Sequence, residues 1–269
     1  MKANINNVNL YYETHGVRGE PLLMIQGWGM DITGWQTIVG PLSKVFHVIL
    51  FDNRGTGRSE VTPGDYTTQQ LADDAAALLD HLQINNVHVL GWSMGGMIAQ
   101  ELVLAYPEKV NGLILSASSA KVNEKSSFIA WSNVEAIKRG ELETSVNWQL
   151  SFCFSSALFA NQALLSEIKE RALNLPYPVT LEGLISQFAA VASHDRRGQL
   201  RPIKSPTLVL GAEEDGIIDI NQVKALADEI DNAQLKILPG GHMHHVEYPY
   251  MFADTVIEFV GKKACFHAA

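Results

Sequence analysis

The sequence predicts an α/β protein with a mostly parallel, eight-stranded sheet that is flanked by helices and interrupted by an all-helical insertion. Short apolar runs alternate with segments of helical periodicity, and this alternation is typical of strands and crossover helices in a doubly wound sheet. Between residues 120 and 201 the pattern is helical throughout, with no convincing buried strand. We therefore expect a core of residues 1–119 and 202–269, with residues 120–201 forming a helical cap.

The strands are predicted from short runs of branched and apolar residues. The first two form a hairpin, because Asn6-Asn7 is a turn signal and residues 8–14 alternate in polarity. Further strands are expected at residues 21–25, 46–51, 87–90, 110–115, 206–210 and 233–238. Helices are expected at residues 67–82, 96–106, 221–230 and 249–262 in the core, and at 128–138, 142–154, 163–173 and 181–192 in the cap. The acidic side chains of the first core helix are expected to form a solvated face: Asp73, Asp74 and Asp80.

Composition and charge favour a globular enzyme and argue against several other classes. Apolar residues make up 46% and charged residues 18% of the 269 residues, which suits a large α/β domain with a substantial core. The net charge of −9 argues against nucleic acid as the main partner, and no apolar run approaches the length of a membrane span. The N-terminus lacks an apolar signal segment, and Cys153 and Cys265 lack metal-ligand spacing. We therefore expect a cytoplasmic protein that needs no metal or cofactor.

The pentapeptide Gly91-Trp92-Ser93-Met94-Gly95 stands where a predicted strand meets a predicted helix. A serine between two glycines at such a corner is the pattern of a nucleophile elbow. The tight turn strains the backbone of its central residue, and side chains at the flanking positions would collide with neighbouring backbone. The serine is held at the helix N-terminus, where free N–H groups favour a developing negative charge. We therefore predict that Ser93 is a catalytic nucleophile.

A serine hydroxyl needs a neighbouring base, and that base is itself oriented by a carboxylate. After a nucleophile elbow, the acid comes first along the chain and the histidine second. Three acids follow the strand predicted at residues 206–210. We favour Asp215, which directly precedes Gly216 and an apolar pair, and we keep Glu214 as the alternative.

Three histidines follow the last predicted strand. The Gly240-Gly241 lead-in favours His242 as the catalytic base, whereas His244 and His245 are expected at the surface or at the rim of the site. His242 would then carry the proton of the nucleophile to the leaving group.

A tetrahedral oxyanion requires two N–H donors. We predict the backbone N–H groups of Met94, which follows the nucleophile, and of Trp28, which lies between glycines after a predicted strand. The predicted pocket wall is apolar, and its members lie close to these loops in the sequence: Trp28, Met30, Trp92 and Met243. Three aromatic residues of the cap either extend this wall or pack the cap onto the core: Phe152, Phe154 and Phe159.

Taken together, these motifs resemble the α/β-hydrolase superfamily, and within it the serine carboxylesterases that carry a helical cap. The matching segments are residues 52–59, 91–95, 211–218, 241–242 and 247–249, and the resemblance covers nearly everything outside the cap. It implies a hydrolase fold in which the cap is inserted after the sixth strand. One departure concerns the oxyanion loop, because members usually carry His-Gly where this chain has Gln26-Gly27.

The resemblance implies hydrolysis of carboxylic esters with small to medium apolar acyl groups or aromatic groups, through an acyl-enzyme. The serine at position 93 disfavours haloalkane dehalogenases and epoxide hydrolases, which use an aspartate there. Enol-lactonases and carbon–carbon bond hydrolases use the same triad and are the alternatives among enzymes. A catalytically silent small-molecule receptor is the alternative of another class, since receptors of this fold can keep the triad.

Three short segments, residues 27–30, 91–96 and 215–216, are similar to the methyl ester esterase of biotin synthesis, which acts on pimeloyl groups held by an acidic carrier protein. This similarity adds an acyl-carrier protein to the candidate partners, beside a small-molecule ester. The predicted cap has nine basic and eight acidic residues, and the remainder has eleven and twenty-one. A near-neutral cap on an acidic body is compatible with an acidic partner but does not require one.

Overall fold

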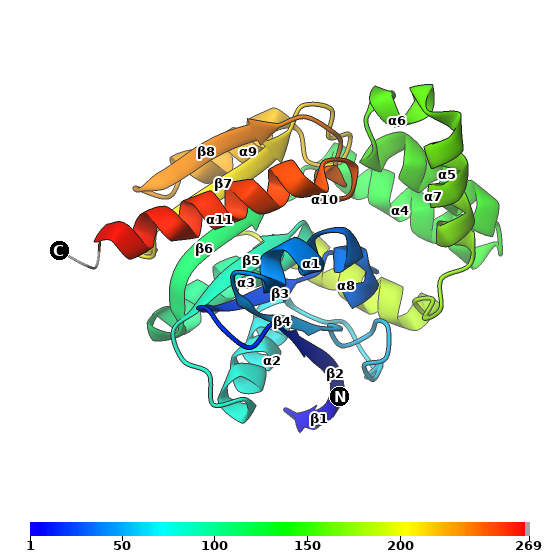
Figure 1. Ribbon diagram of the computed structural model, residues 1–269. Helices are drawn as coiled ribbons and strands as arrows, with labels where there is room; N and C mark the ends of the chain where they lie inside the picture. The colour runs from blue at the N-terminus through cyan, green and yellow to red at the C-terminus, as the bar shows by residue number, and fades with distance from the viewer. Residues whose placement is uncertain (267–269) are drawn as a thin grey trace.

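The computed structural model describes the backbone of residues 1–266 and the side chains of residues 1–261. Its centre is a twisted sheet with the strand order β1-β2-β4-β3-β5-β6-β7-β8 (Figure 1). β2 pairs antiparallel with β1 and with β4, and every other neighbouring pair is parallel. The strands are β1 (Lys2–Ile5), β2 (Val8–His15), β3 (Pro21–Ile25), β4 (His47–Phe51), β5 (Val87–Trp92), β6 (Val110–Ser116), β7 (Thr207–Ala212) and β8 (Ala233–Leu238). The predicted fold class is confirmed.

Helices cover both faces of the sheet (Figure 1). The core helices are α1 (Gln36–Ser43), α2 (Thr68–His81), α3 (Met94–Ala105), α9 (Ile220–Asp228), α10 (His244–Glu247) and α11 (Pro249–Phe266), with short 3-10 helices at Ile32–Trp35 and Pro107–Lys109. One buried cluster joins α2, α3 and α9 to the sheet through Leu71, Ile98 and Val223. A second cluster joins α1 and α11 to the opposite face through Ile38 and Phe252. Within residues 1–266, no helix combines the length and the apolar character needed to cross a bilayer.

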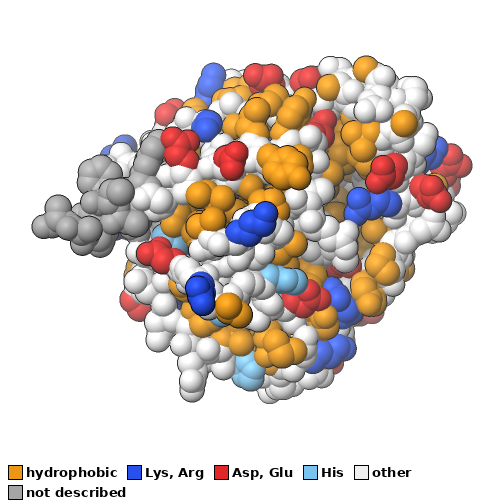
Figure 2. Space-filling model, viewed as in Figure 1, with side chains coloured by type: hydrophobic (Ala, Val, Ile, Leu, Met, Phe, Trp, Pro, Cys, Tyr) orange, Lys and Arg blue, Asp and Glu red, His pale blue; other side chains and the backbone are white. Residues whose placement is uncertain are grey.

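The segment between β6 and β7 forms the helical insertion that the sequence predicts, as a lobe at one end of the sheet (Figure 1). Its helices are α4 (Glu124–Lys138), α5 (Leu142–Cys153), α6 (Ser156–Ala160), α7 (Gln162–Leu173) and α8 (Leu181–Ser193). α6 was not predicted, because its five residues are too few to display a helical period. We refer to α4–α8 as the cap. Charged side chains of both signs are scattered over the face seen in Figure 2, without a patch of a single sign.

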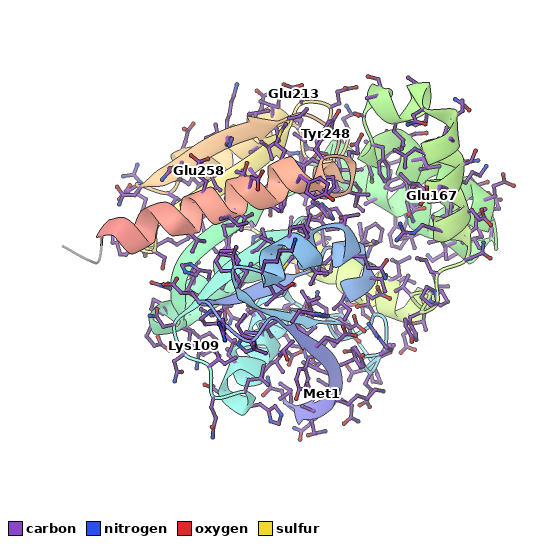
Figure 3. The ribbon with its side chains drawn as sticks, viewed as in Figure 1. Met1, Lys109, Glu167, Glu213, Tyr248 and Glu258 are labelled. Atoms are coloured by element: carbon purple, nitrogen blue, oxygen red, sulfur yellow. The ribbon has the colours of Figure 1, made fainter. Side chains whose placement is uncertain are left out.

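The acidic face predicted for α2 is only partly solvated. Asp80 is exposed and pairs with Lys109, which is labelled in Figure 3. Asp74, by contrast, is buried and accepts hydrogen bonds from two nitrogens of Arg54, at 2.5 and 2.7 Å. The prediction was wrong for Asp74, because its partner comes from the loop after β4 and not from its own helix. A buried carboxylate needs such a partner to offset its desolvation.

Candidate active site

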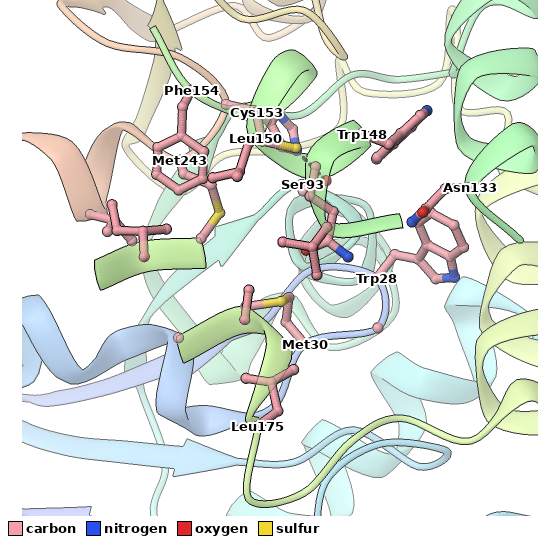
Figure 4. Close-up of a pocket in the computed structure, with 18 of the residues that line it drawn as sticks. Trp28, Met30, Ser93, Asn133, Trp148, Leu150, Cys153, Phe154, Leu175 and Met243 are labelled. Carbon is pink, nitrogen blue, oxygen red and sulfur yellow. Dashed lines mark hydrogen bonds between the residues drawn. The ribbon is translucent and has the colours of Figure 1, made fainter. Parts of the chain in front are cut away.

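Ser93 occupies the corner between β5 and α3 with φ of 56° and ψ of −121°. A positive φ is costly for a residue that carries a side chain, and it persists only where the surrounding structure enforces it. The flanking glycines allow the turn. A Cβ on Gly91 would collide with the carbonyl group of Gly95, and a Cβ on Gly95 would collide with that of Ile25. The turn presents Ser93 to a pocket beneath the cap (Figure 4).

The structure brings Ser93, His242 and Asp215 together in the expected order. His242 Nε2 lies 2.9 Å from Ser93 Oγ, and His242 Nδ1 lies 2.8 Å from Asp215 Oδ2. Because a carboxylate only accepts hydrogen bonds, the second contact places a proton on Nδ1 and leaves the Nε2 lone pair facing the serine hydroxyl. The three residues follow β5, β8 and β7, whose carboxyl ends lie at one edge of the sheet, where open α/β sheets bind their ligands.

Of the two candidate acids, Asp215 is the one that reaches the histidine. Its Oδ1 accepts hydrogen bonds from the backbone N–H groups of Ile217 and Ile218, both at 2.8 Å. These bonds fix the carboxylate so that Oδ2 faces the imidazole. Glu214 is exposed instead, and it accepts a hydrogen bond from the backbone N–H of Ser156 at 2.9 Å.

The cap helps to place both loops that carry these residues. Residues 152–156, at the end of α5 and the start of α6, are called the docking segment here. Within it, the Phe152 carbonyl accepts a hydrogen bond from Gly216 N–H at 3.1 Å, and the Cys153 carbonyl accepts one from Met243 N–H at 2.8 Å. The docking segment thus hydrogen-bonds to Gly216, which follows Asp215, and to Met243, which follows His242.

Glu247 connects the docking segment to the histidine loop. Its carboxylate accepts hydrogen bonds from Gly241 N–H at 2.7 Å and from Ser155 Oγ at 2.5 Å. In the sequence, Glu247 stands out only as part of a segment that matches the superfamily, and no role follows from that match. The contact joins residues 92 positions apart, so no local pattern reveals it. The sequence offers one signal for a role of Glu247, which is that it lies only a few residues after His242.

His244 and His245 are fully buried, so the prediction that they lie at the surface or rim was wrong. His244 Nε2 lies 2.7 Å from Ser116 Oγ, at the end of β6. The His245 ring packs between the indoles of Trp35 and Trp92, with centroid separations of 5.1 and 5.0 Å. The short helix α10 turns both rings into the core, and its four residues are too few to show an inward face in the sequence.

Burial lowers the pKa of His244 to about 4 and also lowers that of His245, because the charged imidazolium loses its hydration. As the pH falls, the two imidazoles therefore take up a proton at a higher pH in the unfolded chain than in the folded chain. We expect the stability to fall as the pH drops from 6.5 to 4, by at most about 3 kcal/mol for His244 at about 1.4 kcal/mol per pKa unit.

Urea denaturation at several pH values measures this dependence. His244→Gln, which does not titrate, should reduce the slope of stability against pH in this window by up to one proton. An unchanged slope would show that His244 is protonated equally in both states.

The backbone N–H groups of Trp28 and Met94 are available for an oxyanion. Among the residues that the structure describes, neither group takes part in a hydrogen bond outside regular helix and strand pairing. Met94 is the first residue of α3, where helix N–H groups have no acceptor within the helix. Gln26, at the position of the usual histidine, is buried, and its Oε1 accepts a hydrogen bond from Gly27 N–H at 3.3 Å. The glutamine thus contacts the loop that carries Trp28.

Ser93 and His242 line a cavity of about 250 Å³ between the core and the cap (Figure 4). All four side chains predicted for its wall line it: Trp28, Met30, Trp92 and Met243. Trp92 also donates a hydrogen bond from its indole N–H to the His242 carbonyl at 2.9 Å. Of the three cap aromatics, Phe154 lines the cavity, Phe152 packs on Trp148, and Phe159 is 39% exposed. The wall is therefore largely apolar, and the cap supplies much of it.

The thiol of Cys153 also lines this cavity, yet it is a poor competitor for the nucleophile's role. Burial, and secondarily the negative charge of Asp215, raise the pKa of the thiol well above its ordinary value. Because the thiolate is the reactive form, a thiol held in its protonated state is inert.

Comparisons with known proteins agree with this geometry. The family model of the alpha/beta hydrolase fold matches residues 20–249. 3-Oxoadipate enol-lactonase 2 of Acinetobacter baylyi is 30% identical over 251 residues, which are 93% of this chain and 92% of that protein. The enol-lactonase of Burkholderia xenovorans has a TM-score of 0.87 at 26% identity over 97% of this chain and 100% of its own. A thermophilic esterase from Thermogutta terrifontis has a TM-score of 0.85 at 27% identity over 97% and 98%. The chain belongs to the α/β-hydrolase fold family.

Proposed function

We propose that the protein is a serine hydrolase that cleaves carboxylic esters through an acyl-enzyme intermediate. The observation that carries this proposal is the continuous contact from Asp215 through His242 to Ser93, at the floor of an apolar cavity. A serine that faces a neutral imidazole nitrogen, with a carboxylate behind the imidazole, is the arrangement that acyl transfer needs.

In this mechanism, Ser93 Oγ attacks the ester carbonyl while His242 Nε2 takes its proton. Asp215 stabilises the imidazolium that forms and keeps the ring in place. The oxyanion accepts hydrogen bonds from the N–H groups of Met94 and Trp28. His242 then protonates the alcohol as its bond to the acyl carbon breaks. Water attacks the acyl-enzyme while His242 takes its proton, and His242 returns that proton to Ser93 Oγ as the acyl–serine bond breaks and the carboxylic acid leaves.

The cavity supports substrates with small to medium apolar acyl groups or aromatic groups. Tryptophan, methionine and aliphatic side chains form most of its wall, and binding there removes apolar substrate surface from water. The negatively charged residues of the triad loops stay outside this wall. We therefore expect the length of the acyl chain to decide the rate among simple esters.

A second candidate reaction is the opening of an enol-lactone on the same triad. The specific support is that two of the relatives compared above are named as enol-lactonases. A lactone is an internal ester, so the same acyl-enzyme forms, but the leaving alcohol stays attached to the acyl group. The two reactions need the same catalytic residues, so the shape of the pocket decides which of the two substrates is accepted.

The test is a series of p-nitrophenyl esters from acetyl to dodecanoyl, assayed beside simple enol-lactones. We expect turnover with an optimum at a short or medium chain, and an acyl adduct on the peptide that contains Ser93 in mass spectrometry of the quenched reaction. Lactone opening that is much faster than ester cleavage would favour the second candidate. Tight binding of these compounds without turnover would contradict both and point to a receptor.

A further inference from the structure

Asn133 is a polar residue in the apolar wall of the cavity. It lies on α4 in the cap and is 3% exposed. Its Oδ1 is buried and has no hydrogen-bond partner among the residues that the structure describes. Asn133 lines the same cavity as Trp28 and Ser93, and Figure 4 shows its amide on the side that faces Ser93.

A buried polar group without a partner is unusual in a folded protein. Removing an amide from water without a compensating hydrogen bond destabilises the fold, and such groups are for that reason nearly always paired. Helix α4 does not need an asparagine at this position, since the residue lies in the helix interior and caps neither end. Because Asn133 lines the cavity, a ligand that enters the cavity can supply the missing partner.

The charges of the cavity indicate which kind of group this partner carries. In the part of the chain that the structure describes, no aspartate or glutamate lines the wall. Its arginine, Arg171, is exposed and donates a hydrogen bond to Gln36 Oε1 at 2.9 Å, so it offers no buried cation for a substrate carboxylate. The group that meets Asn133 is therefore uncharged.

A hydroxyl group fits this description best. Half a turn about the last side-chain bond exchanges the oxygen and nitrogen of the asparagine amide, so Asn133 can turn either a donor or an acceptor toward the cavity. A hydroxyl group can pair with the amide in either orientation, because it both donates and accepts, whereas a ketone oxygen only accepts and can pair only with the nitrogen.

We infer that Asn133 is a specificity-determining residue that binds an uncharged hydroxyl group of the substrate, away from the bond that is cleaved. The inference rests on the proposed function in taking the cavity of Ser93 as the substrate site. It narrows the substrate class from apolar esters or lactones to hydroxylated ones.

The experiment compares matched pairs of esters in which a hydroxyl group replaces a terminal methyl group. Methyl ω-hydroxyalkanoates from hexanoyl to decanoyl place the hydroxyl in the acyl part, and ω-hydroxyalkyl acetates place it in the alcohol part. Binding is measured by calorimetry on Ser93→Ala, which cannot turn the esters over, and kcat/KM is measured on the native chain. We expect at least one hydroxylated ester to bind about tenfold more tightly than its methyl partner, as one good hydrogen bond allows.

Asn133→Leu, which keeps the side-chain volume, should abolish or reverse this preference in both assays. Asn147→Leu is the matched control, because Asn147 is exposed on the neighbouring helix α5 and does not line the cavity. The melting temperature separates binding from a structural role. It should be unchanged or higher in Asn133→Leu, since no side-chain hydrogen bond of Asn133 among the described residues is lost. Asn133→Ala serves if leucine prevents folding.

Equal binding within every pair, or binding of neither member, would overturn the inference, as would a preference that survives in Asn133→Leu. Failure of this inference can be distinguished from failure of the proposed function. Ester turnover without a hydroxyl preference would support the hydrolase proposal and contradict the role of Asn133 in hydroxyl binding. A hydroxyl preference in binding without any turnover would support that role of Asn133 and contradict the hydrolase proposal.

Discussion

Ser93→Ala should lower the kcat for p-nitrophenyl esters at least about 10⁴-fold, because no acyl-enzyme can form without the hydroxyl. The loss should fall on kcat and leave the binding of substrate nearly unchanged, since the apolar wall of the cavity is intact. The melting temperature should also stay close to that of the native chain, because the one hydrogen bond that the hydroxyl makes among the described residues is with His242, and alanine tolerates the turn as well as serine does. Steady-state kinetics and a thermal melt measure both quantities.

The matched control for this substitution is Ser119→Ala. Ser119 is buried, its hydroxyl has no partner among the described residues, and it does not line the cavity. Its replacement should leave kcat within about twofold, as expected for a residue outside the site. If Ser93→Ala retained most of the native rate, the nucleophile would have to be another group or an activated water molecule.

Asp215→Asn should reduce kcat by about 10⁴-fold while preserving the shape of the site. The carboxylate now accepts the proton of His242 Nδ1, and an asparagine amide in its place can donate to that nitrogen instead. The imidazole would then carry its proton on Nε2 and face Ser93 with a donor in place of a lone pair. The base would be lost although no side chain had moved.

Glu214→Gln decides between the two acids that follow β7. Glu214 contacts the backbone of Ser156 and not the imidazole, so this variant should keep kcat within about twofold of the native value. A large loss in Glu214→Gln together with a small one in Asp215→Asn would reverse the assignment.

Much of the fold could be predicted because its signals are local. Apolar runs mark the strands, helical periods mark most of the helices, and glycines mark the turn at Ser93. The same holds for His242, which a glycine pair introduces, and for Asp215, which follows a strand by a short distance. In each case a few neighbouring residues carry the information, and the order along the chain supplies the rest.

The remaining features depend on contacts between distant segments. The burial of Asp74 requires Arg54, the role of Glu247 requires Ser155, and the inward turn of His244 requires Ser116. Each is a polar residue in a short or irregular stretch, where polarity alone suggests exposure to solvent. Asn133 is similar, since one polar residue among several on a cap helix attracts no attention until the helix is seen to form the wall of a cavity.

The hydrogen bonds of the docking segment have a consequence for how specificity can be exchanged between relatives. A chimera made by replacing the whole cap would also change the positions of the carbonyl groups that hydrogen-bond to the acid loop and the histidine loop. Asp215 and His242 would then be held less firmly, even if the new pocket formed correctly. Grafts that spare residues 152–156 should retain the catalytic rate, whereas grafts across them should lose it even when the new pocket suits the substrate. In this chain, the segment that can be exchanged to change specificity without loss of rate is therefore smaller than the cap, and it must exclude the end of α5.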